Sequence, residues 1–241
     1  MLVSPESTKN NRRKRRKSND KQGNLFLKSI LPLTDSQKDA FESYYEKANL
    51  LLHGCPGTGK TFIGLYLALE SILVKNEYKK LIIIRSAVPS RQIGFMPGNE
   101  KEKIKHYEVP YENIVGTLLN RDDGYSVLKS KNFIEFTTTS FLRGTTFDNS
   151  VILVDEIQNM SSIELHTIIT RVGENSRIIF CGDIKQDDLT SERYHEESGI
   201  EPFLDIIEEM KEFEFVEFDI PDIVRSTLLK SYIIARNKLG L

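Results

Sequence analysis

Short apolar runs separated by longer amphipathic segments dominate the chain. Six runs have the length and composition of strands, and several are continuously apolar, as expected when both faces of a strand are buried. They are residues 49–53, 81–85, 132–137, 151–155, 177–181 and 213–218. Helices are predicted over residues 36–48, 60–75, 108–119, 161–171 and 222–238. Strands that alternate with helices predict right-handed crossovers, and therefore an α/β fold with a mostly parallel sheet and helices on both faces.

Capping chemistry supports two of the predicted helix starts. Thr34 or Asp35 precedes the first helix as its candidate N-cap. Ser161 is followed three residues later by Glu164, which is the spacing of a capping box. Both observations place helix starts directly after polar residues that can accept hydrogen bonds from the first turn.

The 241 residues carry a net charge of −2 that is unevenly distributed. Residues 1–24 hold eight Lys or Arg and two Asp or Glu, whereas the rest of the chain holds 25 and 33. The block of like charge over residues 11–17 has no apolar partner, so we expect a disordered basic tail over 1–24 and a single folded domain over 25–241. Two interpretations of the tail stay open: an arm that binds nucleic acid, and a solvated tail with nonspecific affinity for phosphate.

Three absences in the sequence favour a cytoplasmic protein. No apolar run reaches the roughly 18–20 residues that a membrane span needs. No apolar segment follows the basic stretch near the N-terminus, so a secretory signal is not predicted. Cys55 and Cys181 are the only cysteines, which does not indicate a disulfide framework, and a reducing compartment is expected.

A glycine-rich loop between an apolar strand and a helix carries the clearest chemistry. It fits the pattern G-x-x-x-x-G-K-[ST] of a phosphate-binding P-loop. With the residue that follows it, the loop consists of Gly54, Cys55, Pro56, Gly57, Thr58, Gly59, Lys60, Thr61 and Phe62. The first turn of a helix presents unpaired N–H groups and the positive end of its dipole, which suits the triphosphate of ATP. Lys60 is expected to reach the β- and γ-phosphates, and Thr61 to offer its hydroxyl to Mg²⁺.

Two further strands end in polar residues that suit hydrolysis. Asp155 and Glu156 follow an apolar strand, and the carboxyl ends of strands in open α/β sheets bind ligands. Asp155 is predicted to hold Mg²⁺, and Glu156 to orient and deprotonate the attacking water; the alternative is a solvated acidic turn. After the strand at 177–181, Asp183 or Gln186 is predicted to sense the γ-phosphate, the alternative being an ordinary loop.

Gln37 is the candidate for recognising the base of the nucleotide. It lies before Lys60 in the chain, on the helix that is predicted to precede the P-loop strand. Its amide presents a donor and an acceptor together, which matches the edge of adenine. The alternative is an ordinary surface glutamine.

Eight short segments, in this order, resemble the PhoH family of P-loop ATPases, which is related to the N-terminal motor half of superfamily 1 helicases. They are GCPGTGKT at 54–61, RSAV at 85–88, GFMPG at 94–98, SFLRG at 140–144, VILVDEIQN at 151–159, TRVG at 170–173, GDIKQDD at 182–188 and DIVRS at 222–226. The resemblance runs from about Leu33 to Ala235. It implies ATP binding and hydrolysis on a RecA-like core, with a role in RNA metabolism. The chain departs from the family where Thr145 replaces a common arginine.

The sequence shows one P-loop and strands for one sheet, and therefore one RecA-like lobe. A helicase closes its ATP site between two RecA-like lobes of one chain. An arginine that neutralises the γ-phosphate would then come from a neighbouring subunit, and we expect a homo-oligomeric ring, a hexamer. Arg225 is the first candidate for this arginine finger, with Arg143 and Arg171 as the others. The alternative for Arg225 is a salt bridge with Asp222 on the same helix.

Three functions fit these motifs. The first is an Mg²⁺-dependent ATPase that acts on single-stranded RNA or DNA. The second is a nucleotide-gated module with slow hydrolysis that binds nucleic acid or protein, and the third, less favoured, is a nucleotide kinase. Phe95, Phe141 and Phe147 are candidates for stacking on bases, with apolar packing as the alternative. A nuclease site is not supported, because Asp183, Asp187 and Asp188 are close only in sequence.

Overall fold

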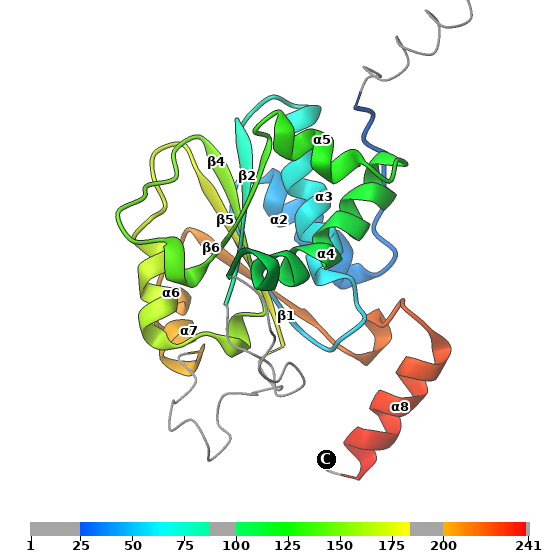
Figure 1. Cartoon of the computed structure of the whole chain (residues 1–241). Coiled ribbons are helices and arrows are strands. Elements are labelled where there is room, and N and C mark those ends of the chain that lie inside the picture. The colour runs from blue at the N-terminus through cyan, green and yellow to red at the C-terminus, as the bar shows by residue number, and fades with distance from the viewer. Residues whose placement is uncertain (1–24, 87–99, 184–199, 240–241) are drawn as a thin grey trace, which may run out of the picture.

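A six-stranded, all-parallel sheet forms the centre of the molecule. The computed structural model describes residues 25–86, 100–183 and 200–239. The strands are β1 (Asn49–Gly54), β2 (Lys80–Arg85), β3 (Ile134–Thr138), β4 (Ser150–Asp155), β5 (Arg177–Gly182) and β6 (Phe213–Phe218). They lie in the order β3-β2-β4-β5-β1-β6, and every neighbouring pair is parallel (Figure 1). All six predicted strands are therefore confirmed.

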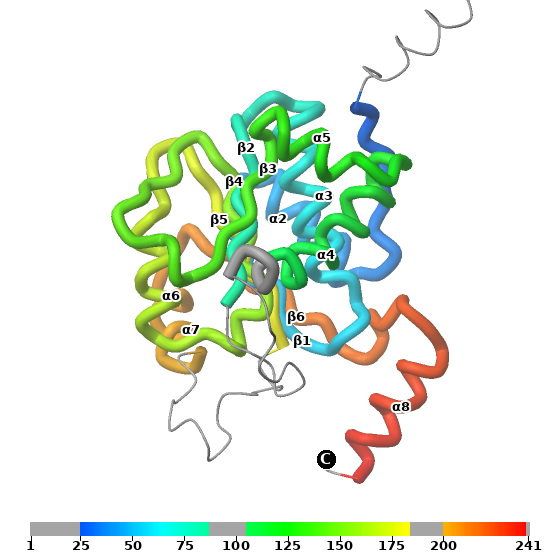
Figure 2. Tube along the Cα trace, viewed as in Figure 1, coloured from blue at the N-terminus to red at the C-terminus, as the bar shows by residue number. Residues whose placement is uncertain are grey.

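Helices cover both faces of this sheet. They are α2 (Asp35–Tyr45), α3 (Lys60–Leu73), α4 (Glu100–Leu119), α5 (Gly124–Ser130), α6 (Ser162–Ile169), α7 (Ile200–Glu208) and α8 (Thr227–Lys238). Helices α2 to α5 pack on one face and α6 and α7 on the other, while α8 projects from the body (Figures 1 and 2). Alternate strand residues feed two cores, with Leu50 and Leu52 on the first face and Leu51 on the second. The predicted α/β fold, with a parallel sheet and helices on both faces, is confirmed.

The last helix begins later than the sequence pattern indicates. We expected it from Asp222, but Ile220–Asp222 is a 3-10 turn and α8 starts at Thr227, capped by the Ser226 side chain. The reason is a long-range contact: the N–H groups of Val224 and Arg225 donate to the Gly57 carbonyl at 3.1 and 3.2 Å. These residues are held against the P-loop and do not continue a helix. The prediction also missed α5 and α7.

The other helix starts follow the predicted capping chemistry. Thr34 is the N-cap of α2, and its side chain accepts from the N–H of Gln37. Ser161 and Glu164 form the predicted capping box of α6, which ends at Ile169 and not at 171. Helix α4 begins at Glu100, earlier than the predicted 108.

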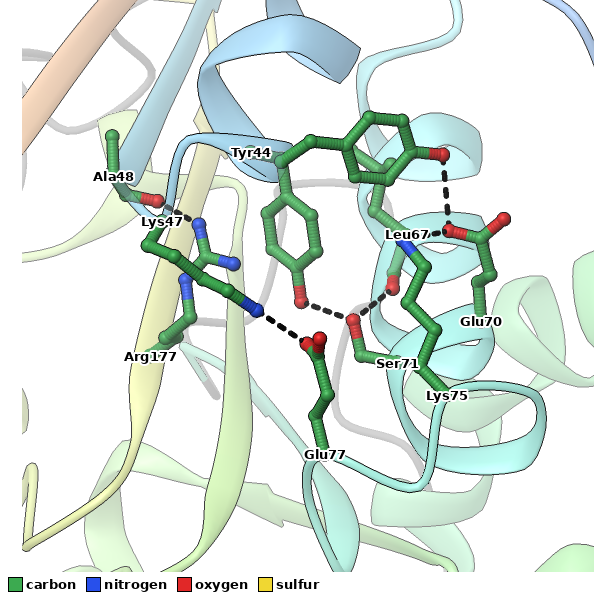
Figure 3. Close-up of polar contacts among 10 residues, drawn as sticks. Tyr44, Lys47, Ala48, Leu67, Glu70, Ser71, Lys75, Glu77 and Arg177 are labelled. Atoms are coloured by element: carbon green, nitrogen blue, oxygen red, sulfur yellow. Dashed lines mark hydrogen bonds and ion pairs between the residues drawn. The ribbon is translucent and has the colours of Figure 1, made fainter.

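A buried polar cluster fixes the end of α2 that lies away from the P-loop (Figure 3). The Arg177 guanidinium lies 3.7 Å above the ring of Tyr44 and donates to the Ala48 carbonyl. The Tyr44 hydroxyl is hydrogen-bonded to Ser71 of α3 at 2.9 Å, and burial raises the pKa of Tyr44 far above its ordinary value. On the surface of the same cluster, Lys47 pairs with Glu77 at 2.7 Å. These contacts tie α2 to α3 and β5.

Several sequence predictions fall outside the described residues. They concern the basic tail at 1–24, the GFMPG segment at 94–98 with Phe95, and Gln186 with Asp187 and Asp188. The division into a tail and a single domain over 25–241 therefore stays a prediction. Neither Cys55 nor Cys181, both of which the structure describes, is part of a disulfide. In the part of the chain that is described, no helix combines the length and the apolar character that crossing a membrane requires.

Candidate nucleotide-binding site

The P-loop connects β1 to α3 with glycines where neighbouring backbone leaves no room for a side chain. Gly54 has φ of 117°, and a Cβ added there would lie 2.0 Å from the carbonyl oxygen of Phe218 in β6. Gly57 has φ of 79°, and a Cβ there would lie 2.4 Å from the Leu229 side chain. Both conformations are left-handed ones that favour glycine. The loop thus keeps a shape that leads directly into the first turn of α3.

Lys60 folds back over this loop. Its ammonium donates to the carbonyl oxygens of Gly54 at 2.7 Å and Cys55 at 2.8 Å. Burial lowers the pKa of Lys60, and the negative charges of Asp183 and Asp155 act in the opposite direction. The structure therefore places a partly buried cation within the loop, close to the acidic ends of two strands.

Asp155, at the end of β4, contacts the P-loop directly. Its Oδ1 accepts a hydrogen bond from the Thr61 hydroxyl at 2.9 Å, and its Oδ2 accepts one from the hydroxyl of Tyr111 on α4 at 2.9 Å. The carboxylate is buried, with 7% of the residue exposed. Burial and the charge of Glu156 raise the pKa of Asp155 to about 6, although both hydroxyls act to lower it. The two residues predicted to hold Mg²⁺ are thus adjacent.

Glu156 is oriented by a neighbour that the sequence analysis did not single out. Its backbone is left-handed, with φ of 57°, at the start of the 3-10 turn Ile157–Asn159. The Gln158 amide nitrogen donates to the Glu156 carboxylate at 2.6 Å, and the Gln158 amide oxygen accepts from the N–H of Asp183 at 3.2 Å. Gln158 is buried, with 5% exposed. It therefore links the candidate base to the end of β5.

Sheet topology brings the three strand ends together. Strand β5 lies between β1 and β4, with His53 opposite Gly182 and Asp155 opposite Cys181. Asp183 follows β5 directly and is itself buried, at 7% exposure. It therefore lies between the P-loop and the Asp155–Glu156 pair. The linear sequence contains the three motifs but not this order of strands.

Gln37 is not a surface residue, so the alternative interpretation of it is wrong. It is buried, with 5% exposed. Its amide nitrogen donates to the Thr58 carbonyl at 2.9 Å, and its amide oxygen accepts from the N–H of Leu33 at 2.8 Å. Gln37 thus joins α2 and the segment before it to the P-loop. Recognition of adenine by Gln37 stays a prediction.

Arg225 lies beside the P-loop of its own chain, just before α8. Its backbone N–H donates to Gly57, and its side chain is exposed. The Asp222 carboxylate instead accepts from Ser36 at 2.9 Å and from the Asp219 N–H at 3.0 Å. Burial acts to raise the pKa of Asp222, but hydrogen bonds from Thr34, Asp219 and Ser36 outweigh it and lower the pKa. Within the described residues no ion pair joins Arg225 to Asp222, so that alternative is not supported.

The other candidate arginines lie elsewhere. Arg143 borders a cavity of about 300 Å³ between the 3-10 turn Thr139–Phe141 and α6, lined by Thr139, Ser140, Arg143, Ile163, Glu164 and Thr167. Arg171 follows α6 and donates to the Thr145 carbonyl at 3.5 Å. Of the described aromatic candidates, Phe141 is 50% exposed, whereas Phe147 belongs to the core. Phe147 therefore serves packing and not base stacking.

Two residues of this site escaped the sequence analysis. Gln158 follows Glu156 by two positions inside VILVDEIQN, so its place in the motif was a usable signal. Tyr111 lies 44 residues before Asp155 in a helix whose pattern indicates only core packing, and no local signal identifies it.

Comparison with known proteins places the chain in a family. A family profile described as "PhoH-like protein" matches residues 29–236. The chain is 29% identical over 212 residues to the PhoH-like protein of Bacillus subtilis, covering 88% of this chain and 65% of that one. It is 31% identical over 201 residues to Protein PhoH of Escherichia coli, covering 83% and 56%. The chain thus spans between half and two thirds of the length of these relatives.

Solved structures with a similar fold are more distant. The large terminase of bacteriophage D6E in complex with ADP matches with a TM-score of 0.49 and 13% identity, covering 84% of this chain and 49% of that one. The Sulfolobus solfataricus SWI2/SNF2 ATPase core in complex with double-stranded DNA matches with a TM-score of 0.45 and 15% identity, covering 81% and 46%. The family assignment rests on the sequence relatives and on the profile that covers residues 29–236: this chain belongs to the PhoH family.

Proposed function

We propose that the chain binds ATP with Mg²⁺ and hydrolyses it. The observation that carries this proposal is the contact between the Thr61 hydroxyl and the Asp155 carboxylate, with Glu156 next to it. A module that only binds nucleotide needs a P-loop but no base. A carboxylate that is held by the buried amide of Gln158 favours hydrolysis over simple binding.

The residues present fit a magnesium–nucleotide complex. Asp155 is buried beside Glu156, and the pKa of Asp155 near 6 reflects the unfavourable burial of that negative charge. A divalent cation at Thr61 and Asp155 would offset this cost. Magnesium usually binds through one or two carboxylates and substrate phosphates, without a cage of protein ligands. This agrees with the described residues, among which no cluster of three or more His, Cys, Asp or Glu could hold a metal.

Each side chain then has a defined part in the proposed reaction. The backbone N–H groups of the P-loop and the Lys60 ammonium bind the phosphates, and Gln37 keeps the loop fixed to α2. Glu156 orients the attacking water and accepts its proton. Asp183 or Gln186 is the proposed sensor at the γ-phosphate. Bound Mg²⁺ would neutralise charge that develops on the phosphate oxygens.

We further propose that hydrolysis is coupled to single-stranded RNA or DNA. The cavity between the 3-10 turn Thr139–Phe141 and α6 supports this, because it offers a cation on Arg143 together with the hydroxyl of Ser140. Such groups suit a phosphate backbone. Phe141, half exposed beside it, supplies a ring on which a base could stack. The cavity is joined to the end of β2 through Glu164, which accepts from Ser86 at 3.2 Å.

Measuring ATP turnover with and without single-stranded RNA, at about 50 and 200 mM salt, tests the coupling. We expect stimulation that is larger at the lower salt concentration, because phosphate contacts are screened. Arg143→Ala should lower the stimulation while leaving turnover without RNA unchanged; a fall in both would identify Arg143 as the arginine finger. Absence of stimulation by RNA and by single-stranded DNA at both salts would exclude coupling and favour a nucleotide-gated binding module.

We also propose that a second subunit completes the site. Arg225 is exposed next to its own P-loop, and α8 projects from the body with Leu228 80% exposed and Tyr232 62% exposed (Figure 1). A ring, in which each subunit supplies an arginine to its neighbour, would use such a surface. Sedimentation velocity should give a mass above that of a monomer, and a strict monomer with undiminished turnover would exclude the ring.

A further inference from the structure

We propose that Tyr111 is a positioning residue that fixes the orientation of the Asp155 carboxylate toward the bound magnesium–nucleotide. The inference rests on the proposed Mg²⁺–ATP site and adds a residue from α4 to it. Tyr111 lies outside the P-loop and outside both strand ends that carry the acidic residues. Its hydroxyl nevertheless contacts the carboxylate at the centre of the site.

The two oxygens of Asp155 have different partners. Oδ1 accepts from Thr61, which belongs to the P-loop, and Oδ2 accepts from Tyr111. Both donors are 2.9 Å away. If the Thr61 hydroxyl turned to a bound cation, the Tyr111 hydroxyl would still hold Oδ2. The carboxylate therefore keeps Oδ1 directed toward the P-loop instead of rotating about its last torsion, which is soft in aspartate.

Tyr111 is itself held rigidly. It is completely buried, and its ring lies 5.7 Å from the ring of Phe136 on β3. One helical turn earlier on the same face of α4, the ring of Tyr107 lies 5.4 Å from the Arg85 guanidinium. Arg85 is the strand partner of Asp155 in the register of β2 and β4. Two tyrosines thus dock α4 onto the ends of the strands that form the site.

A purely structural role would have a different signature. Buried tyrosine hydroxyls need a partner, and Tyr111 would then use Asp155 only to satisfy its own hydrogen bond. In that case its removal would change stability but not the response to Mg²⁺. Residues that orient a metal ligand instead change metal affinity by roughly 10- to 100-fold when they are replaced.

Tyr111→Phe separates the two roles, because it removes the hydroxyl and keeps the ring. The measurement is the affinity for a fluorescent ATP analogue, titrated with Mg²⁺ and repeated in EDTA. In Tyr111→Phe, we expect a rise of about 10-fold in the Mg²⁺ concentration that gives half of the maximal increase in affinity for the analogue. Affinity in EDTA should stay within about twofold of the wild type, because the P-loop contacts to phosphate are unchanged.

Tyr125→Phe is the matched control. The Tyr125 hydroxyl also donates to a buried carboxylate of α4, that of Glu108, at 2.6 Å, but away from the P-loop. This variant should lose stability to urea without any change in the Mg²⁺ titration. If Tyr111→Phe does not unfold cooperatively, Tyr111→Met, which also lacks the hydroxyl and has a flexible apolar side chain, is titrated in its place.

The outcomes separate this inference from the proposed function. A wild-type protein whose affinity for nucleotide does not respond to Mg²⁺ would contradict the proposed function itself. A wild type that responds, with Tyr111→Phe and Tyr125→Phe giving the same titration as the wild type, would overturn only the role of Tyr111. A shifted Mg²⁺ titration confined to the Tyr111 variant supports it.

Discussion

Lys60→Ala is expected to abolish ATP turnover, with a fall of at least about 10²–10³-fold, as when a preorganised cationic or hydrogen-bonding group is removed from an active site. Lys60 is the one P-loop side chain whose charge is directed into the loop, and two backbone carbonyls hold its ammonium there. Its removal takes away the charge that would contact the β- and γ-phosphates. It also leaves the carbonyls of Gly54 and Cys55 without that donor.

The measurement is steady-state phosphate release, with nucleotide affinity determined separately. Lys60→Arg should be nearly as inactive, because a planar guanidinium does not reproduce the compact ammonium. Lys47→Ala is the matched control, since it removes a lysine whose ion pair with Glu77 lies on the surface at the far end of α2. Turnover of Lys60→Ala within threefold of the wild type would contradict the proposed role of the P-loop.

Glu156→Gln is expected to bind ATP with affinity close to that of the wild type and to hydrolyse it about 10²–10⁴-fold more slowly. The substitution keeps the size of the side chain and removes its ability to accept a proton. In the wild type the Gln158 amide nitrogen donates to the Glu156 carboxylate at 2.6 Å. In the variant it can still donate to the amide oxygen of the new side chain. The geometry of the turn is therefore preserved while the base is lost.

Single-turnover experiments measure the rate of hydrolysis, and retention of ATP on a filter measures its binding separately. An ATPase motor should retain unhydrolysed ATP and stall, whereas a nucleotide-gated binding module should function almost as before. Glu135→Gln serves as the control, because Glu135 forms a surface ion pair with Lys80 at 2.7 Å. Hydrolysis by Glu156→Gln at the wild-type rate would show that Glu156 is not the base.

Local features of the sequence were sufficient for much of the fold. The central strands follow from short apolar runs, because strands that are buried on both faces are mostly apolar along their length. The P-loop follows from glycines before Lys60 and Thr61, and the structure places these where only glycine fits. The capping box of Ser161 and Glu164 is likewise a contact within four residues.

Tertiary contacts decided the features that the pattern missed or misjudged. Helix α8 starts at Thr227 and not at Asp222, because hydrogen bonds to the Gly57 carbonyl, far away in sequence, hold Val224 and Arg225 against the P-loop, and Ile223 before them is extended. Gln37 is buried where its amide nitrogen donates to the Thr58 carbonyl of the P-loop. Neither this contact nor the one to Gly57 is visible in the local sequence around Gln37 or Asp222.

The sequence by itself therefore determined the P-loop, the carboxylates at strand ends and the family resemblance, since each depends on residues that are adjacent in the chain. The tertiary structure decided the strand order that puts Asp183 between the P-loop and Glu156. It also decided that Tyr111 holds the Asp155 carboxylate and that Gln158 links Glu156 to Asp183 at the end of β5. The physical reason is that hydrogen bonds between buried side chains depend on how elements pack, and packing joins residues that no short sequence pattern connects.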